Sequence, residues 1–122
     1  MLSVDDITCI HDTMIDTYGG IKGVRDKGLL SSIVSGVHQT YGGVALYPTV
    51  LDKICRIYYM FITNQVFLDG NKRTATSVAL VLLYMYGYSI PKEFNNDSYK
   101  LALDVSNGKI SYEELIQIFG GA

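Results

Sequence analysis

The feature that most restricts the fold of this chain is an unbroken apolar run, ALVLLYMY, at residues 79–86. It continues a helical pattern that begins near Asn71, and it stops at Gly87, a residue type that commonly closes helices. The run is far shorter than the ~20 residues that a helix needs to cross a bilayer. A helix that is apolar on every side and does not cross a membrane belongs inside a protein core. We therefore expect a buried central helix over residues 71–86, surrounded by other helices.

Most of the remaining chain also has the spacing of amphipathic helices. Apolar residues recur mainly three or four positions apart in five further segments: residues 4–15, 29–37, 50–62, 99–105 and 115–119. Capping signals precede four of these segments. Two are pairs, Ser3 with Asp6 and Ser111 with Glu114, and two are the single residues Asp26 and Asp97. Pro48 is expected in the first turn of the remaining helix. Apart from a residue or two near positions 88–90, no alternation typical of strands persists. The pattern predicts an all-α bundle that forms a single domain over residues 1–122.

Composition and charge narrow the class of protein. Hydrophobic residues make up 48% of the 122 residues and charged residues 18%, which is typical of a globular chain. The formal net charge of -2 argues against a broad nucleic-acid-binding surface, so an anion site has to be local. The N-terminal residues lack the basic and apolar regions of a signal peptide, and we expect no membrane segment. Cys9 and Cys55 fall in apolar helical patterns, which favours reduced core thiols and a cytoplasmic protein.

A short polar segment at the start of the expected central helix is the main candidate for chemistry. It consists of Asp69, Gly70, Asn71, Lys72 and Arg73. The first amides of a helix lack intrahelical partners, and the helix dipole adds positive character there. Gly70 permits a tight turn, and Lys72 and Arg73 add two positive charges, of which Arg73 can hold a phosphate through two parallel hydrogen bonds. This combination is typical of an anion-binding helix start.

Two residues of this region need a separate explanation. A carboxylate repels phosphate unless a cation lies between them, so Asp69 indicates Mg²⁺, which binds carboxylates together with substrate phosphates. Phe67 is an apolar residue in a polar loop, and we expect it to anchor the loop in the core. An ordinary turn with solvated charges is the alternative, although positive residues at a helix start oppose the dipole at a cost of about 0.3–1 kcal/mol each. The segment alone does not decide between a ligand site and a turn.

Residues 65–73 read QVFLDGNKR and closely resemble the signature of the death-on-curing (Doc) branch of the Fic/Doc family. That signature is His-x-Phe-x-Asp/Asn-Gly/Ala-Asn-Lys-Arg, whereas the Fic branch has His-Pro-Phe-x-x-Gly-Asn-Gly-Arg. The chain matches the Doc signature at every defined position except the first, where Gln65 stands in place of histidine. Further similarity lies at Tyr18-Gly19-Gly20, Gly23-Val24-Arg25-Asp26, Gly28-Leu29-Leu30, Tyr47-Pro48 and Asn107-Gly108-Lys109. The resemblance therefore covers essentially the whole chain.

The resemblance implies a Fic/Doc-like helical bundle and a toxin of a toxin–antitoxin system that transfers a phosphoryl group from ATP. In this interpretation Asp69 holds Mg²⁺, while Gly70, Asn71, Lys72 and Arg73 bind the nucleotide phosphates. The implied target is a hydroxyl of elongation factor Tu, a translation protein. The implied partner is a Phd-like antitoxin, and neither a nucleic acid nor a membrane is expected to bind directly.

Adenylyl transfer from ATP, the reaction of the Fic branch, is the alternative chemistry. Lys72 stands where Fic proteins have glycine, and Ala75 stands where they have a second arginine that contacts the γ-phosphate. Both differences disfavour adenylyl transfer, and they favour a kinase-like transferase.

Gln65 occupies the position of the family's general base, the histidine that takes the proton from the target hydroxyl. With Asp69, Lys72 and Arg73 it makes up the implied catalytic set. An amide cannot accept a proton near neutral pH, and losing a general base costs about 10²–10⁴-fold in rate. We expect this chain to be catalytically impaired, either through an engineered change, which the intact remainder of the motif favours, or as a silenced natural copy. A catalytically silent module that binds nucleotide or antitoxin is a further alternative.

Neither of the chain's two histidines is a substitute for the missing base. His11 lies on the first expected helix, and His38 lies at the end of the second. Neither has Cys, Glu or His at metal-ligand spacing, so surface or capping roles are expected for both.

Overall fold

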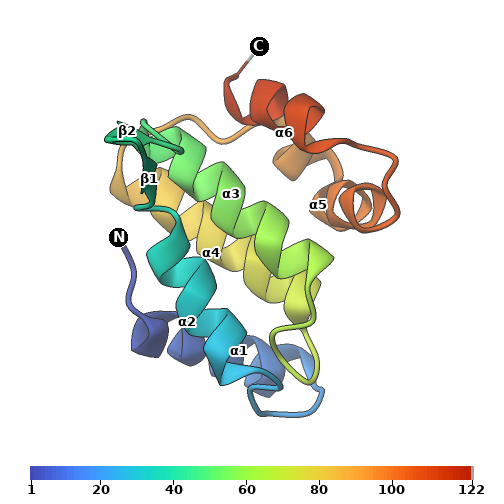
Figure 1. Ribbon diagram of the computed structural model, residues 1–122. Helices are drawn as coiled ribbons and strands as arrows, with labels where there is room; N and C mark the ends of the chain where they lie inside the picture. Colours follow the sequence, from blue (N-terminus) through green and yellow to red (C-terminus); the bar gives the residue numbers. More distant parts are fainter. Residues whose placement is uncertain (122) are drawn as a thin grey trace.

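The chain folds into six α-helices and one small hairpin in a computed structural model, which describes residues 1–121. The helices are α1 Val4–Tyr18, α2 Lys27–Gly36, α3 Val50–Thr63, α4 Asn71–Met85, α5 Lys92–Ser106 and α6 Tyr112–Phe119, and the strands are β1 Thr40–Tyr41 and β2 Val44–Ala45. Helices α3 and α4 pack side by side through the middle of the molecule, with α1 and α2 on one side and α5 and α6 on the other (Figure 1). The predicted all-α class is confirmed.

The starts of three helices follow the capping signals in the sequence. Complete capping boxes begin α1 and α6, formed by Ser3 with Asp6 and by Ser111 with Glu114. The Asp26 side chain accepts a hydrogen bond from a backbone amide in the first turn of α2. In each case a side-chain oxygen satisfies an amide that the helix itself leaves unpaired.

Two helix starts differ from the prediction. Pro48 does not lie in a first turn, because Thr49 and Asp52 form a capping box that starts α3 at Val50. Asp97 does cap a helical segment through the Lys100 amide, but a turn of helix at residues 92–96 precedes it. The extended backbone of Asp97, with φ -165° and ψ 90°, bends α5 where the two parts meet.

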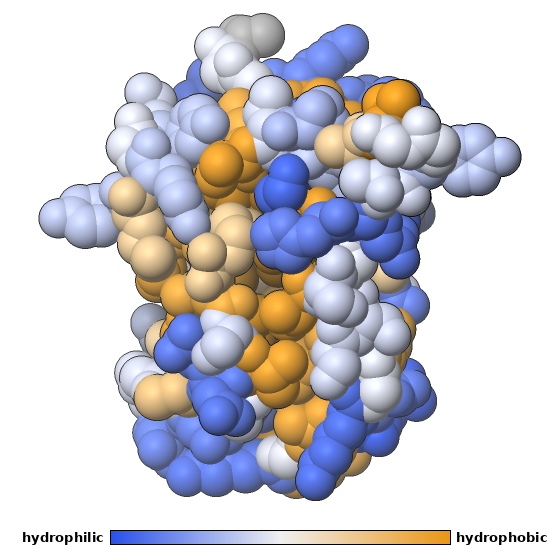
Figure 2. All heavy atoms as spheres, turned by 60° about the vertical axis from the view of Figure 1, so that its left-hand side comes forward, coloured by the Kyte–Doolittle hydropathy of each residue, from blue (hydrophilic) through white to orange (hydrophobic). Residues whose placement is uncertain are grey.

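Helix α4 is the central helix of the bundle and packs against α3, α1 and α5. Its buried side chains are Thr74, Ala75, Val78, Ala79, Leu82 and Leu83. The expected central position is confirmed, but burial on every side is not. Tyr84 is 85% exposed and Met85 54%, because the C-terminal end of α4 has one side that no other helix covers. Apolar residues are also visible as a band on the molecular face drawn in Figure 2.

The hairpin of β1 and β2 was not predicted. Its strands pair antiparallel, with Thr40 opposite Ala45 and Tyr41 opposite Val44. Gly42 and Gly43 both have positive φ, 57° and 81°, which is the requirement of the tight turn that suits a two-residue hairpin. The sequence pattern missed it because two-residue strands are too short to show alternation.

The two cysteines lie in different environments. Both are free thiols, and Cys55 is buried on α3 as expected. Cys9 is exposed, so its predicted place in the core is wrong: the inward positions of α1 are Ile7, His11 and Ile15. None of the helices within residues 1–121 combines the length and apolarity needed to span a bilayer.

Candidate functional site

Residues 65–73, which we call the motif loop, connect α3 to the first turn of α4. Gly70 is the N-cap of α4 and has the left-handed conformation, with φ 75° and ψ 21°. It offers no side-chain cap, so the first amides of α4 remain available to a ligand. A Cβ at position 70 would lie 3.1 Å from Ile15 Cδ1, so the backbone also passes close to α1 here.

The Asn71 side chain closes the motif loop on itself. Its Oδ1 accepts a hydrogen bond from Phe67 N at 2.9 Å, and its Nδ2 donates to Phe67 O at 3.0 Å. Phe67 has no exposed surface, and its ring packs 6.0 Å from the Phe61 ring. The predicted role of Phe67 as a core anchor is confirmed.

The segment at residues 23–26 holds the other side of the motif loop. Val66 O accepts hydrogen bonds from the backbone amides of Arg25 and Asp26, and Leu68 N donates to Gly23 O. Val24 and Phe67 form an isolated antiparallel bridge. The Arg25 side chain adds a hydrogen bond from Nε to Gln65 O. The backbone before α4 is therefore held by hydrogen bonds of the kind that join neighbouring strands.

His11 supports the motif loop from α1, and its predicted surface or capping role is wrong. The side chain is 1% exposed, and its ring stacks on the Phe67 ring with 4.0 Å between centroids and 8° between planes. Its Nε2 lies 2.7 Å from Asp69 O. Because a carbonyl oxygen only accepts hydrogen bonds, Nε2 carries the proton. His11 is thus unable to replace the missing base, whereas His38 is exposed as predicted.

The Asp69 carboxylate is exposed, but the surrounding backbone orients it. Oδ1 accepts from Gly70 N at 2.9 Å, and Oδ2 accepts from Ile21 N at 3.2 Å. Gly20 makes room for it, since a Cβ at position 20 would come within 2.7 Å of Oδ2. Each ionised carboxylate oxygen has a further lone pair that can bind a cation, and Mg²⁺ is commonly held by one or two carboxylates plus substrate phosphates. The Asp69 carboxylate is therefore placed where it could serve as a ligand of Mg²⁺.

A cavity of about 480 Å³ opens beside the motif loop. It brings together all the site residues predicted from the sequence: Gln65, Asp69, Gly70, Asn71, Lys72 and Arg73. Tyr99 and Ser106 from α5 line it as well. A second cavity of about 420 Å³ shares Lys72, Arg73 and Tyr99 with the first, and is otherwise lined by residues of α1, α4 and α5 such as Met14, Leu80 and Ala102. A polar cavity thus adjoins a more apolar one at Lys72 and Arg73.

The two cations of this cavity, Lys72 and Arg73, differ in exposure. Lys72 is half-buried, while Arg73 is exposed with its guanidinium carbon 4.5 Å from the Tyr18 ring centroid, within cation–π distance. No ion pair to Lys72 or Arg73 is found among the described residues, so both cations are available to an anion. Ala75, the position of the second Fic-branch arginine, is fully buried in α4 and does not line either cavity.

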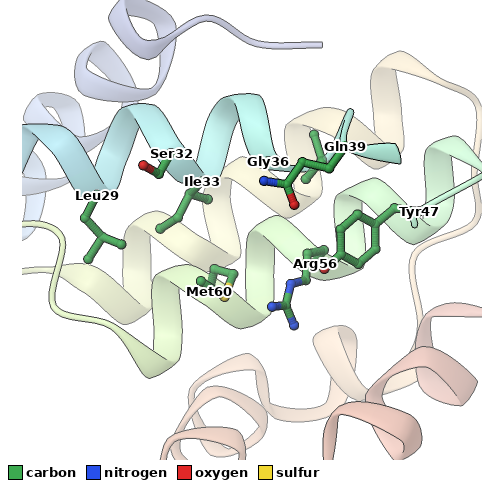
Figure 3. Close-up of a pocket in the computed structure, with 9 residues that line it drawn as sticks. Leu29, Ser32, Ile33, Gly36, Gln39, Tyr47, Arg56 and Met60 are labelled. Carbon is green, nitrogen blue, oxygen red and sulfur yellow. The ribbon is translucent and has the colours of Figure 1, made fainter. Parts of the chain in front are cut away.

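A third cavity, of about 140 Å³, lies between α2 and α3 and contains no residue of the motif loop (Figure 3). Its charged residue is Arg56, whose guanidinium carbon is 5.1–5.7 Å from the ring centroids of Tyr47, Tyr59 and Tyr112. Three aromatic faces stabilise this cation without a ligand. We interpret the third cavity as packing between helices.

Sequence reasoning missed several contributors to the site. Arg25, Gly20 and Tyr99 all contact the motif loop or line its cavity, and His11 lies beneath the loop. Gly20 and Arg25 did stand in segments that resemble the family, but only the folded chain places them against Gln65 and Asp69. His11 had a readable signal, since it lies on the inward face with Ile7 and Ile15.

Comparisons with known proteins identify the family of this chain. Residues 1–83, which include the whole motif loop, match the model of the Fic/DOC family. Toxin Doc of Mycolicibacterium smegmatis is 36% identical over 80 residues, which is 66% of this chain and 62% of that protein. Protein kinase doc of Escherichia phage P1 is 28% identical over 92 residues, 73% of this chain and 70% of that protein. The match thus spans less than two thirds of the mycobacterial relative's length. With a family model that covers most of its length and relatives on the Doc side, this chain belongs to the Fic/DOC family.

Proposed function

We propose that this chain is a Doc-like toxin domain built to transfer the γ-phosphoryl group of ATP to a protein hydroxyl, with Mg²⁺ as cofactor. The observation that carries the proposal is the gathering of Asp69, Lys72, Arg73 and the uncapped start of α4 around one cavity. Elongation factor Tu is the proposed target, by resemblance to the Doc branch. A Phd-like antitoxin is the proposed partner, on the same basis.

The residues of the cavity have complementary roles in this proposal. The unpaired backbone amides in the first turn of α4 that follow Gly70, together with the side chains of Lys72 and Arg73, bind and orient the phosphate oxygens, which carry several negative charges. Asp69 holds Mg²⁺, which supplies neutralisation of the phosphate charge when bound. In a reaction of this class, positioning and electrostatic stabilisation provide most of the rate enhancement. A loop fixed by Asn71 and by residues 23–26 suits that task.

Removal of the proton from the target hydroxyl is the step at which this chain is deficient. The target oxygen bonds to the γ-phosphorus, the bond from that phosphorus to the β–γ bridging oxygen breaks, ADP leaves, and the hydroxyl proton passes to a base. Gln65 lines the cavity, but its amide cannot accept this proton near neutral pH. We therefore propose that the chain binds nucleotide and reacts slowly, about 10²–10⁴-fold below a form with histidine at this position.

Two observations favour phosphoryl transfer over adenylyl transfer. Lys72 places a cation at the cavity where the Fic branch has glycine, and Ala75 leaves no second arginine there. One relative bears the name protein kinase doc, which agrees with the same chemistry. A catalytically silent nucleotide-binding module is the second candidate, and Gln65 is the observation that favours it.

The test is to restore the base and follow labelled phosphate. Gln65→His is incubated with purified elongation factor Tu, Mg²⁺ and ATP labelled at either the α- or the γ-phosphate. We expect transfer from the γ-position alone, together with growth inhibition when the variant is expressed in cells. The double variant Gln65→His/Lys72→Ala serves as the control, because it has the base but lacks the phosphate contact.

Other outcomes separate the alternatives. Transfer of the α-label would assign the Fic-type reaction. ATP binding without transfer of either label, and without growth inhibition, would support the silent module and contradict the kinase proposal.

A further inference from the structure

We propose that His11 is a positioning residue for the phosphate site, acting through the backbone of Asp69. It lies on α1, 58 positions before Asp69, and touches the motif loop with two different parts of its ring. The ring face stacks on Phe67, and Nε2 donates to Asp69 O at 2.7 Å. Because it touches neither nucleotide nor reacting atoms in this account, it is not a catalytic residue.

The hydrogen bond from His11 to the Asp69 carbonyl affects the neighbouring groups of the motif loop, because that carbonyl shares a peptide unit with the Gly70 amide. The peptide unit between Asp69 and Gly70 sets the direction of the Gly70 amide, which donates to Asp69 Oδ1. The same unit leads into the left-handed Gly70 and so fixes where α4 begins. A donor that holds this carbonyl therefore orients both the carboxylate and the uncapped amides of α4.

Simple core filling does not explain a histidine here. The neighbouring inward positions on α1 are Ile7 and Ile15, and an apolar side chain would fill position 11 without burying polar nitrogens. Burying an unpaired polar group is costly, whereas a donor that meets a carbonyl oxygen avoids that cost. The Nε2–H group thus has a specific partner, and that partner belongs to the proposed magnesium ligand.

Two substitutions separate the hydrogen bond from the ring. His11→Phe keeps an aromatic ring that can stack on Phe67 but has no donor. His11→Gln loses the ring but can bring an amide N–H to the place of Nε2. Ile7→Val, one turn earlier on the same buried face, is the control for general loosening of α1.

The primary measurement is amide hydrogen exchange, which needs no ligand. Phe67 N donates to Asn71 Oδ1 and Thr74 N donates to Gly70 O, so both amides report on the order of the motif loop. Leu115 N, bonded to Ser111 O in α6, is the remote reference. We expect His11→Phe to raise exchange at Phe67 and Thr74 relative to Leu115, and His11→Gln to restore protection. Ile7→Val is expected to leave the ratio unchanged.

The consequence for ligand binding rests on the proposed function and is measured separately, by calorimetry with ATP and Mg²⁺. Loss of a group that orients a metal ligand typically costs about 10-fold or more in affinity. His11→Phe is expected to weaken binding by that factor, with His11→Gln close to the parent chain.

The two measurements fail in different ways. Unchanged exchange at Phe67 and Thr74 in His11→Phe would overturn the positioning role, even if the parent chain binds ATP. Increased exchange in both variants without rescue by His11→Gln would assign His11 to core packing alone. If exchange behaves as expected but no variant, including the parent, binds ATP, the loop-ordering role stands and the proposed function fails.

Discussion

The side chain of Asn71 pairs with both backbone groups of Phe67: Oδ1 accepts from the amide at 2.9 Å, and Nδ2 donates to the carbonyl at 3.0 Å. The first residue of α4 thereby holds Phe67, whose ring is anchored in the buried core. Only a side-chain amide has both a donor and an acceptor in this arrangement. The proposed phosphate site is therefore built on a link between the start of a helix and the core.

Replacing Asn71 tests that link. Asn71→Asp keeps an acceptor for Phe67 N but loses the donor to Phe67 O. We expect a loss of roughly 1–3 kcal/mol in the free energy of unfolding, the usual cost of leaving a buried backbone group unpaired. Urea unfolding followed by circular dichroism measures it. The exposed Asn95 on α5 provides the control, and an equal effect of Asn95→Asp would contradict the role given to Asn71.

Gly19 and Gly20 form a matched pair for the orientation of Asp69. Both have positive φ, 86° and 125°, so an alanine strains the backbone at either position. A Cβ at Gly19 meets nothing within 4 Å, whereas one at Gly20 lies 2.7 Å from Asp69 Oδ2. We expect Gly20→Ala to weaken magnesium-dependent ATP binding while Gly19→Ala preserves it, as measured by calorimetry. Equal binding by both variants would show that the carboxylate does not need its observed position.

Phe67 and its neighbour Leu68 form a second matched pair. Phe67 is fully buried between the rings of His11 and Phe61, while Leu68 is 54% exposed. Phe67→Ala is expected to lower the free energy of unfolding by about 3–5 kcal/mol, as other large-to-small changes in cores do. Leu68→Ala should cost much less in the same urea titration. A small effect of Phe67→Ala would mean that the loop is not anchored through this ring.

The two thiols should differ in reactivity and in their effect on stability at high pH. Burial raises the pKa of the Cys55 thiol to about 12, from an ordinary value of 9.0. Because the unfolded thiol ionises first, the contribution of Cys55 to stability is complete below pH 9 and is lost between pH 9 and about 12. In the folded chain at pH 8, a thiol reagent should modify exposed Cys9 and spare Cys55.

Cys55→Ala provides the control for the pH effect. Burial also raises the pKa of Tyr112 to about 12, from an ordinary value of 10.0, so some loss of stability above pH 10 remains in this variant. The decline in the free energy of unfolding should nevertheless be shallower than in the parent chain. Rapid labelling of Cys55 without unfolding, or identical pH curves, would contradict the assigned environment.

The helical part of the fold could be predicted because its signals are local. Ser3, Asp26 and Ser111 start helices as their capping patterns indicate. The run at residues 79–86 identified the central helix, since an apolar helix too short to cross a membrane belongs inside the bundle. The prediction that this helix is buried on every side was wrong at Tyr84 and Met85, because periodicity cannot reveal how many neighbouring helices cover a given side.

Only part of the candidate site could be predicted, and the reason differs from that for the helices. The motif loop is contiguous, so Asp69, Asn71, Lys72 and Arg73 were bound to lie together once a helix began at Asn71. Contacts between distant segments carried no local signal: Gly20 against Asp69, Arg25 on Gln65, and Tyr99 across the cavity depend on how helices pack. His11 was assigned to the surface because its chemistry was judged without its place on the inward face of α1.

The central claim is that the start of α4 binds triphosphate oxygens with magnesium, and calorimetry with ATP on the parent chain tests it most directly. We predict binding of one ATP per chain that requires Mg²⁺. Lys72→Ala and Arg73→Ala should each weaken it by about 10-fold or more, the usual effect of losing a charged hydrogen bond. Lys92→Ala, at the exposed start of α5, should leave it unchanged. Absence of binding, or binding that is indifferent to Lys72 and Arg73, would contradict the account.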